Sequence, residues 1–229
     1  MNFLEKALTF IFPTTCGICG AINKGYLCEK CKQDLIFSNI FLNQSDSYTC
    51  KKEYFIDEHF YLFSYEGIIR EKILQYKFNE QSYLFNTFSE FFVNNKKLYG
   101  FLKKYDIIVP VPISKLRKRE RGYNQSELIA KKITAMESIT FEPNILVKIK
   151  NNKSQSNLNK KQRLENVKNV YEIKNLQKIK EKNILIFDDI YTTGATTNEC
   201  ARILKKKGCK KVGVLTIAKD LKKEAINKN

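Results

Sequence analysis

Two adjacent carboxylates are followed at once by hydroxyl side chains and a glycine near residue 190. Asp188 and Asp189 come directly after the apolar run 184–187. The residues of the loop that follows are Thr192, Thr193, Gly194, Ala195 and Thr196. Unpaired backbone amides at the start of a helix bind phosphate, and glycine lets the backbone come close to it. Carboxylates accept hydrogen bonds from neighbouring hydroxyls, so the pattern predicts a site for a sugar phosphate.

Three other kinds of structure have a similar local pattern. A Walker B strand also ends in acids, but it works with a loop G-x-x-x-x-G-K-[ST], which this sequence lacks. A response-regulator acid pocket would not carry a Thr-Thr-Gly phosphate loop beside the acids. An ordinary strand-to-helix turn, with the aspartates accepting from loop amides, remains open. The order of acids, hydroxyls and glycine favours the sugar-phosphate site.

Four cysteines near the N-terminus have the spacing of a metal site. Two C-x2-C pairs, eight residues apart, place thiols at Cys16, Cys19, Cys28 and Cys31. Structural zinc takes four thiolates at the corners of a tetrahedron, and such a closed site leaves no position for a substrate. Two redox pairs are the alternative, but redox C-x-x-C motifs start a helix after a strand, and no strand is predicted before Cys16. We therefore expect one structural Zn2+.

Three arginines follow the run VPVPI at residues 109–113. They are Arg117, Arg119 and Arg121. Arginine contacts phosphate oxygens through two parallel N–H donors, so these side chains can bind pyrophosphate or DNA. Surface cations that flank a helix are the alternative, and the sequence leaves it open, although anion binding is favoured.

Apolar strands and helices are predicted along the chain, and from Tyr105 onward they alternate. Strands are predicted at 59–67, 105–113, 145–150, 183–189 and 210–219. Helices are predicted at 3–12, 68–79, 82–97, 124–135 and 196–208, and 151–167 is polar. This alternation indicates an α/β fold with a parallel sheet covered by helices on both faces. Ligands bind at the carboxyl ends of such strands, where the two aspartates fall.

The length and composition suit one ordinary domain and a small accessory one. The chain has 229 residues, of which 43% are hydrophobic. We place an N-terminal zinc-binding region at 1–57 and the α/β domain at 58–229. No apolar run approaches the roughly 20 residues of a membrane span, and the first residues lack the features of a signal peptide. We therefore expect a cytoplasmic protein whose cysteines are thiols or metal ligands.

The net charge of +17 is concentrated in the second part of the chain. Residues 1–104 carry 13 basic and 11 acidic side chains, net +2, whereas residues 105–229 carry 28 and 13, net +15. A basic part of this kind predicts a polyanionic partner, which can be nucleic acid, a phosphate-rich metabolite or an anionic membrane surface. A composition rich in Lys and Asn throughout is the other explanation, and charge alone does not separate the two.

The stretch around the two aspartates resembles a known motif. ILIFDDIYTTGAT, at residues 184–196, is similar to the phosphoribosyl pyrophosphate (PRPP) motif of type I phosphoribosyltransferases, although Tyr191 stands where a smaller aliphatic residue is usual. The resemblance implies that Asp188 and Asp189 hold the ribose hydroxyls. It also implies that residues 192–196 hold the 5′-phosphate and that Mg2+ accompanies PRPP.

Four further segments resemble motifs of the ComF family of competence proteins and follow one another in the same order as in that family. They are the four cysteines after Phe12-Pro13, YEGIIREKILQYKF at 65–78, VPVPISKLRKRERGYNQSELIA at 109–130, and the spaced Gln155, Leu158, Arg163 and Asn166. The resemblance covers nearly the whole chain and is weakest at 35–57. It implies a zinc-binding N-terminal part, a phosphoribosyltransferase-like domain with a covering loop at Gln155 and Arg163, and a role in DNA uptake during natural transformation.

Two functions of different classes follow. The first is a competence factor that binds PRPP or a related phosphoribosyl ligand and single-stranded DNA. It would work with other DNA-uptake proteins, in association with the inner face of the membrane. The alternative is an active phosphoribosyltransferase with an unknown acceptor, releasing pyrophosphate by displacement at the anomeric carbon. That chemistry needs positioning and charge neutralisation rather than a side-chain nucleophile, so no catalytic residue is assigned. His59 is expected to be structural, and Cys200 and Cys209 are expected to be core thiols.

Overall fold

The computed structural model describes residues 13–48, 54–78, 81–93, 95–135, 139–150 and 160–221. The helix predicted at 3–12, Cys50, Gln155 and the side chain of Arg163 lie outside this description. None of the described helices has the length and apolar character that a membrane span requires.

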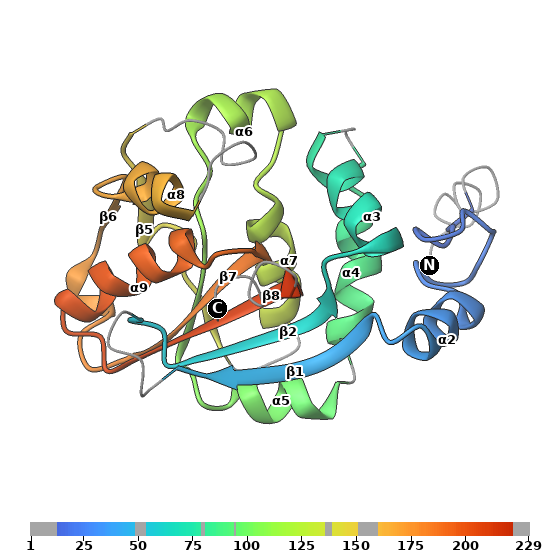
Figure 1. The fold of residues 1–229 in the computed structure, drawn as a ribbon, viewed down its shortest axis with the longest axis horizontal. Helices are drawn as coiled ribbons and strands as arrows, with labels where there is room; N and C mark the ends of the chain where they lie inside the picture. The colour runs from blue at the N-terminus through green and yellow to red at the C-terminus, as the bar shows by residue number, and fades with distance from the viewer. Residues whose placement is uncertain are drawn as a thin grey trace, which may run out of the picture.

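A six-stranded sheet forms the centre of the fold (Figure 1). In spatial order its strands are β1 (Phe41–Ser47), β2 (Glu58–Ser64), β8 (Lys211–Lys219), β7 (Asn183–Tyr191), β3 (Ile107–Pro110) and β4 (Thr140–Phe141). Every neighbouring pair is parallel except β1 and β2, which are antiparallel. The predicted α/β class with a parallel sheet is therefore confirmed, with one antiparallel strand added at the edge.

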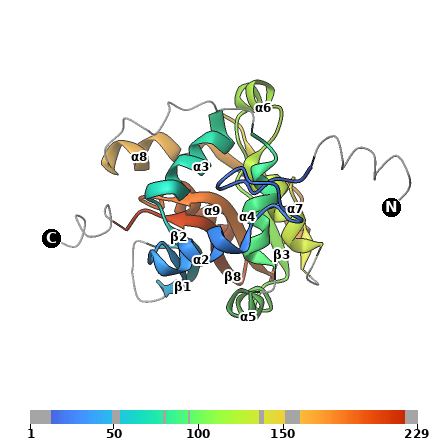
Figure 2. The ribbon, with the colours of Figure 1, turned by 90° about the vertical axis from the view of Figure 1, so that its right-hand side faces the viewer.

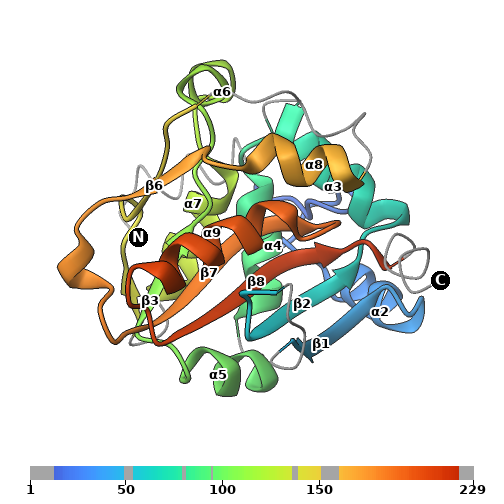
Figure 3. The same cartoon turned by 60° about the vertical axis from the view of Figure 1, so that its left-hand side comes forward.

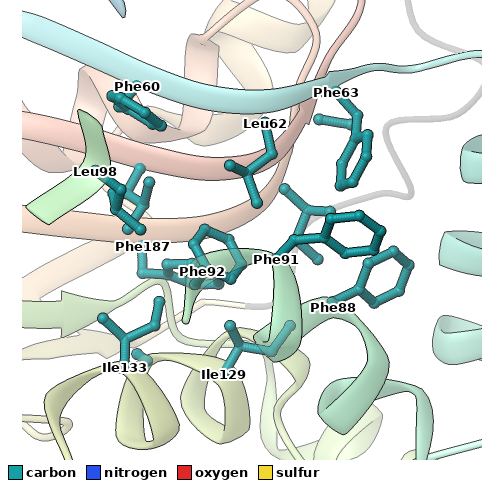
Figure 4. Close-up of a cluster of buried hydrophobic side chains, with 14 of the residues drawn as sticks. Phe60, Leu62, Phe63, Phe88, Phe91, Phe92, Leu98, Ile129, Ile133 and Phe187 are labelled. Carbon is teal, nitrogen blue, oxygen red and sulfur yellow. The ribbon is translucent and has the colours of Figure 1, made fainter. Parts of the chain in front are cut away.

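Apolar side chains of β7 point alternately to the two faces of the sheet. Leu185 and Phe187 are buried with α4 (Leu84–Phe92) and α7 (Gln125–Thr134) on one face. Ile184 and Ile186 are buried with α9 (Ala195–Lys206) on the other. Figure 3 shows α9 on the near side of the sheet and α4 and α7 behind it, and Figure 4 shows Phe187 among the phenylalanines of α4. Because helices cover both faces here, neither face of the strand can be polar, which is why the run 184–187 is continuously apolar.

The other elements surround this core. In the described part of the chain, the remaining helices are α2 (Glu29–Phe37), α3 (Gly67–Phe78), α5 (Lys96–Leu102), α6 (Lys115–Arg121), α8 (Lys160–Val167) and the 3-10 turn η1 (Leu176–Lys178). The strand predicted at 145–150 forms as β5 (Leu146–Lys148), but it lies outside the main sheet and pairs antiparallel with β6 (Tyr171–Ile173). It cannot join β3 because β4 already occupies that edge.

Three residues expected to be structural are buried. His59 is fully buried and its Nε2 lies 2.8 Å from Thr216 Oγ1. Burial lowers the pKa of His59 well below its usual value, so the ring is neutral. Cys200 and Cys209 lie in the core on the α9 side of the sheet. The structural roles predicted for these three residues are confirmed.

β1 lies on the N-terminal side of the boundary predicted after residue 57, yet it hydrogen bonds to β2 and so completes the main sheet. Its Asp46 pairs with the buried Lys219 of β8, across the intervening strand. The division of the chain at residue 57 stays a prediction.

Candidate functional site

A cavity of about 1030 Å3 opens at the carboxyl ends of the parallel strands. Asp188 and Asp189 of β7 line it, as does every residue of the loop 192–196. The strand continues through Tyr191, two residues beyond the predicted end at residue 189, so the aspartates lie within the strand near its carboxyl end, as predicted. The opposite wall comes from α3 and α6, which are far apart in sequence from the loop.

The backbone conformation of Gly194 shapes the loop. Its φ of 71° lies in the left-handed region, and an added Cβ would lie 2.2 Å from Tyr191 Oη, so only glycine fits there. The 12-residue helix α9 begins at the next residue, with its first amides at the cavity. Such amides are not paired within the helix and carry partial positive charge. This arrangement suits a phosphate.

The two carboxylates have different surroundings. The Oδ2 atom of Asp189 forms an ion pair with Nζ of Lys77, a residue of α3, at 2.8 Å. Asp188 Oδ1 accepts from the Asp189 backbone N–H at 2.9 Å and lies 3.4 Å from Ser126 Oγ. Burial and the neighbouring Asp189 carboxylate raise the pKa of Asp188 to about 7. Asp188 is therefore the group that would gain most from hydroxyl donors of a ligand.

We expect that Asp188→Asn stabilises the protein at alkaline pH. The raised pKa means that folding favours the protonated carboxyl, and this stabilisation is present below the ordinary value of 3.8 and lost as pH rises through about 7. Asparagine cannot ionise, so it avoids the loss. Thermal unfolding should give the variant a higher Tm than the parent at pH 8, by about 2–4 °C for each kcal/mol. The difference should shrink toward pH 4, and a pH-independent difference would contradict the assignment.

Helix α6 carries the three predicted arginines, but only two of them face the cavity. Arg117 and Arg121 are four residues apart, lie on one face of the helix and line the cavity. Arg119 is exposed and does not line it. The helix begins where Ser114 Oγ accepts from the Arg117 N–H at 3.2 Å, and it ends at Gly122 with a φ of 76°.

A third cation faces the same part of the cavity from the small sheet. Lys148 of β5 lines the cavity. Burial and the positive charge of Arg117 lower the pKa of Lys148 to about 8. Burial also lowers the pKa of Arg121, whose Nη1 donates to Gln125 Oε1 at 3.0 Å. Like charges held together in this way favour an anion between them.

The sequence-based analysis missed two of these residues. Lys77 lies within the segment 65–78 and Lys148 within a predicted strand, but neither was assigned a role. Only the fold brings α3, β5 and β7 to one cavity. The one available signal was a lysine near the end of a predicted strand that precedes a polar segment, as Lys148 is.

The four predicted cysteines form a second site, away from this cavity. Their Sγ atoms all lie within 4.8 Å of one another, and Cys19 and Cys28 Sγ are 3.8 Å apart. Zinc–sulfur bonds of about 2.3 Å in a tetrahedron give sulfur separations of about 3.8 Å. The cluster could therefore hold a metal ion such as zinc. The amide N–H of Cys31 also points to Cys28 Sγ, at 3.4 Å, as is common around a thiolate.

The segment that carries the cysteines packs on α4, as Figure 2 shows. Tyr26 makes two contacts with that helix: its N–H donates to Glu90 Oε1 at 2.6 Å, and its carbonyl accepts from Thr87 Oγ1 at 3.1 Å. Gly17 lies so close that an added Cβ would be 2.1 Å from Thr87 Oγ1. The cysteine segment is thus held against α4 by hydrogen bonds and close packing, in addition to its covalent connection along the chain.

Comparisons with known proteins identify the family. The sequence model described as "Phosphoribosyl transferase domain" matches residues 107–228, more than half of the chain. Competence protein ComFC of Bacillus subtilis is 34% identical over 148 residues, which are 64% of this chain and 58% of that protein. Competence protein F of Haemophilus influenzae is 29% identical over 64% of this chain and 66% of its own length.

Competence protein ComFC of Streptococcus pneumoniae is 31% identical over 161 residues, which cover 70% of this chain and 68% of that protein. The matches thus span between about three fifths and two thirds of these relatives. This chain combines a phosphoribosyl transferase domain at residues 107–228 with a four-cysteine cluster before it, and both features fit a ComF-family protein. The chain belongs to the ComF family of competence proteins and contains a phosphoribosyl transferase domain.

Proposed function

We propose that this protein is a competence factor that binds PRPP, or a related phosphoribosyl ligand, together with single-stranded DNA during DNA uptake. One observation carries the ligand part of the proposal. A single cavity joins two carboxylates, a phosphate-type loop at a helix start and a group of cations on the facing wall. The names of the relatives, which are competence proteins, support the cellular role.

The cavity offers a partner for each part of PRPP. The loop 192–196 would hold the 5′-phosphate, and Asp188 and Asp189 would accept from the ribose hydroxyls. Arg117 and Arg121 would hold the pyrophosphate through their N–H donors. The carboxylates are also the hard oxygen ligands that Mg2+ accepts. When bound with PRPP, Mg2+ would supply part of the charge neutralisation that pyrophosphate needs.

Lys77 would regulate access to Asp189. Because its Nζ already pairs with Asp189, ribose hydroxyls must share that carboxylate with Lys77 or displace it. The pair also links α3 to the PRPP motif, so a bound ligand would change the stability of α3 through Lys77. We therefore expect PRPP to protect α3 from amide exchange if it shares Asp189 with Lys77.

Active transfer is the second candidate, and the size of the cavity favours it. On the side of α3, the apolar side chains of Leu74 and Phe78, together with Tyr65 just before the helix, line the cavity beside the charged Arg70 and Lys77. An acceptor could lie there. The bond between the anomeric carbon and pyrophosphate would break, and a bond to the acceptor would form as the acceptor loses a proton. Arg117, Arg121 and Lys148 would stabilise the leaving pyrophosphate. Pyrophosphate release in the presence of candidate acceptors would test this function.

DNA binding rests on the charge of residues 105–229, which is net +15. We expect single-stranded DNA to bind without strong sequence preference and with an affinity that falls steeply as salt is raised, because phosphate contacts release counterions. Fluorescence anisotropy with a labelled oligonucleotide at several salt concentrations measures both quantities. The absence of binding even at low salt would remove the DNA part of the proposal and leave the phosphoribosyl part standing.

A further inference from the structure

Helix α6 has two faces with different surroundings. It has seven residues, KLRKRER, of which five are basic and one is acidic, and none of them is buried. Arg117 and Arg121 face the cavity. Lys115, Lys118 and Arg119 are exposed and do not line it. Positions three and four apart share one side of a helix, so these three cations form a second basic face, directed away from the cavity.

The outer face of α6 has little acidic compensation. Lys118 Nζ pairs with Glu127 at 3.2 Å, and 57% of the lysine side chain is exposed. Among the described residues, no ion pair is recorded for Lys115 or Arg119. A compact group of solvated cations on one short helix favours a partner that carries closely spaced negative charges.

An exposed aromatic ring lies beside this helix. Phe78, the last residue of α3, is 66% exposed, and the Arg121 guanidinium carbon lies 4.9 Å from its ring centroid. The contact joins the end of α3 to α6 across the rim of the cavity. A large ring in solvent next to cations is suited to stacking on a flat partner, and nucleic-acid bases are such partners.

We infer that the outer face of α6 and the ring of Phe78 form a binding surface for single-stranded nucleic acid. Lys115, Lys118 and Arg119 contact the phosphates, and an unpaired base stacks on Phe78. The inference rests on the DNA part of the proposed function and places it at the rim of the cavity. A single strand is required because a base within a duplex has no free face for Phe78. An anionic membrane would satisfy the cations but offers no ring to stack.

The charge arm of the test compares two double variants with the same loss of charge. Lys115→Ala with Arg119→Ala removes two cations from the outer face of α6. Lys206→Ala with Lys207→Ala removes two exposed cations from the other end of α9, about 18 Å of helix from the cavity. Anisotropy with a labelled oligothymidylate should show a salt slope lower by about 1.4 for the α6 variant, at about 0.7 for each phosphate contact. The α9 variant should keep the slope of the parent.

The stacking arm uses Phe78→Ala and, as its control, Phe37→Ala. Phe37 is 81% exposed and ends α2, in the cysteine-bearing part of the chain. Phe78→Ala should weaken binding roughly fivefold to a hundredfold, as expected for one stacked base, with the salt slope unchanged. The same variant should bind an abasic strand of equal length as well as the parent does. Phe37→Ala should leave affinity unchanged.

Three results would overturn the surface while leaving DNA binding itself in place. The two charge variants could lose affinity equally, which would indicate diffuse attraction. Phe37→Ala could weaken binding while Phe78→Ala does not, which would assign DNA to the cysteine segment. The outer-face variants could retain oligonucleotide binding but lose binding to phosphatidylserine vesicles, which would assign α6 to a membrane surface. If the parent fails to bind any oligonucleotide at low salt, the DNA part of the proposed function fails first.

Discussion

Replacing both Asp188 and Asp189 with alanine is expected to weaken PRPP binding about a hundredfold or more. Hydrogen bonds to charged groups contribute about 1.5–3 kcal/mol each, so each single variant should lose roughly tenfold or more in affinity. Thr193→Ala should have a smaller effect, because it removes a neutral hydroxyl. Isothermal titration calorimetry with PRPP and Mg2+ measures the affinity of each variant.

The aspartate variants need controls that separate binding from folding. Asp188→Ala removes a carboxyl that is destabilising when ionised, so this variant should remain folded. Asp189→Ala leaves Lys77 without its ion-pair partner in a partly buried position, so Asp189→Asn is the gentler substitution. Asp34→Ala, on the exposed side of α2, removes an acid outside the cavity and should leave affinity unchanged. A folded double variant that binds PRPP as well as the parent would show that the ligand site is elsewhere.

Loss of the metal is expected to have the largest effect on stability. We predict one zinc per chain at the four-cysteine cluster, because its four sulfur atoms lie within 4.8 Å of one another and one pair, at 3.8 Å, has the separation of a tetrahedral site. Structural zinc contributes about 10–16 kcal/mol of apparent binding free energy in small domains. The segment also packs on α4 through Tyr26, so chelation should lower the Tm of the main domain as well as disorder the segment.

Metal analysis of protein purified without chelator tests this directly. The expected result for the parent is about one equivalent of zinc. Cys28→Ser should lose this zinc and should unfold at a lower Tm than the parent. Cys200→Ser is the matched control, because Cys200 is a buried thiol outside the cluster and its loss should not change the zinc content. Near-zero zinc in protein with all four thiols reduced would contradict the metal site.

The elements that were predicted accurately are those whose local pattern of apolar and polar residues shows which side chains are buried. The strand at β7 and the helices α7 and α9 were predicted within two residues, since a strand buried on both faces must be continuously apolar. The loop after β7 was predicted from the order of its residue types, because acids, hydroxyls and glycine have distinct chemical uses there.

Elements that depend on distant partners could not be predicted. β1 reads FLNQSDS, with no alternation and no fully buried residue, because an edge strand needs only one neighbour. The ion pair between its Asp46 and Lys219 spans 173 positions along the chain. The same holds for Lys77 in the site. Its partner Asp189 lies in β7, far from α3 along the sequence, so the sequence alone does not indicate that the two residues pair. The division of the arginines on α6 required knowledge that they form a helix.

The most direct test of the central claim is a calorimetric titration of the parent protein with PRPP in the presence of Mg2+. The cavity, with its two carboxylates, its loop at the start of α9 and its facing cations, predicts saturable binding near one ligand per chain. It also predicts that inorganic pyrophosphate competes, since it would occupy the positions beside Arg117 and Arg121. No heat of binding at millimolar PRPP, with protein that is folded and has its metal, would contradict the claim.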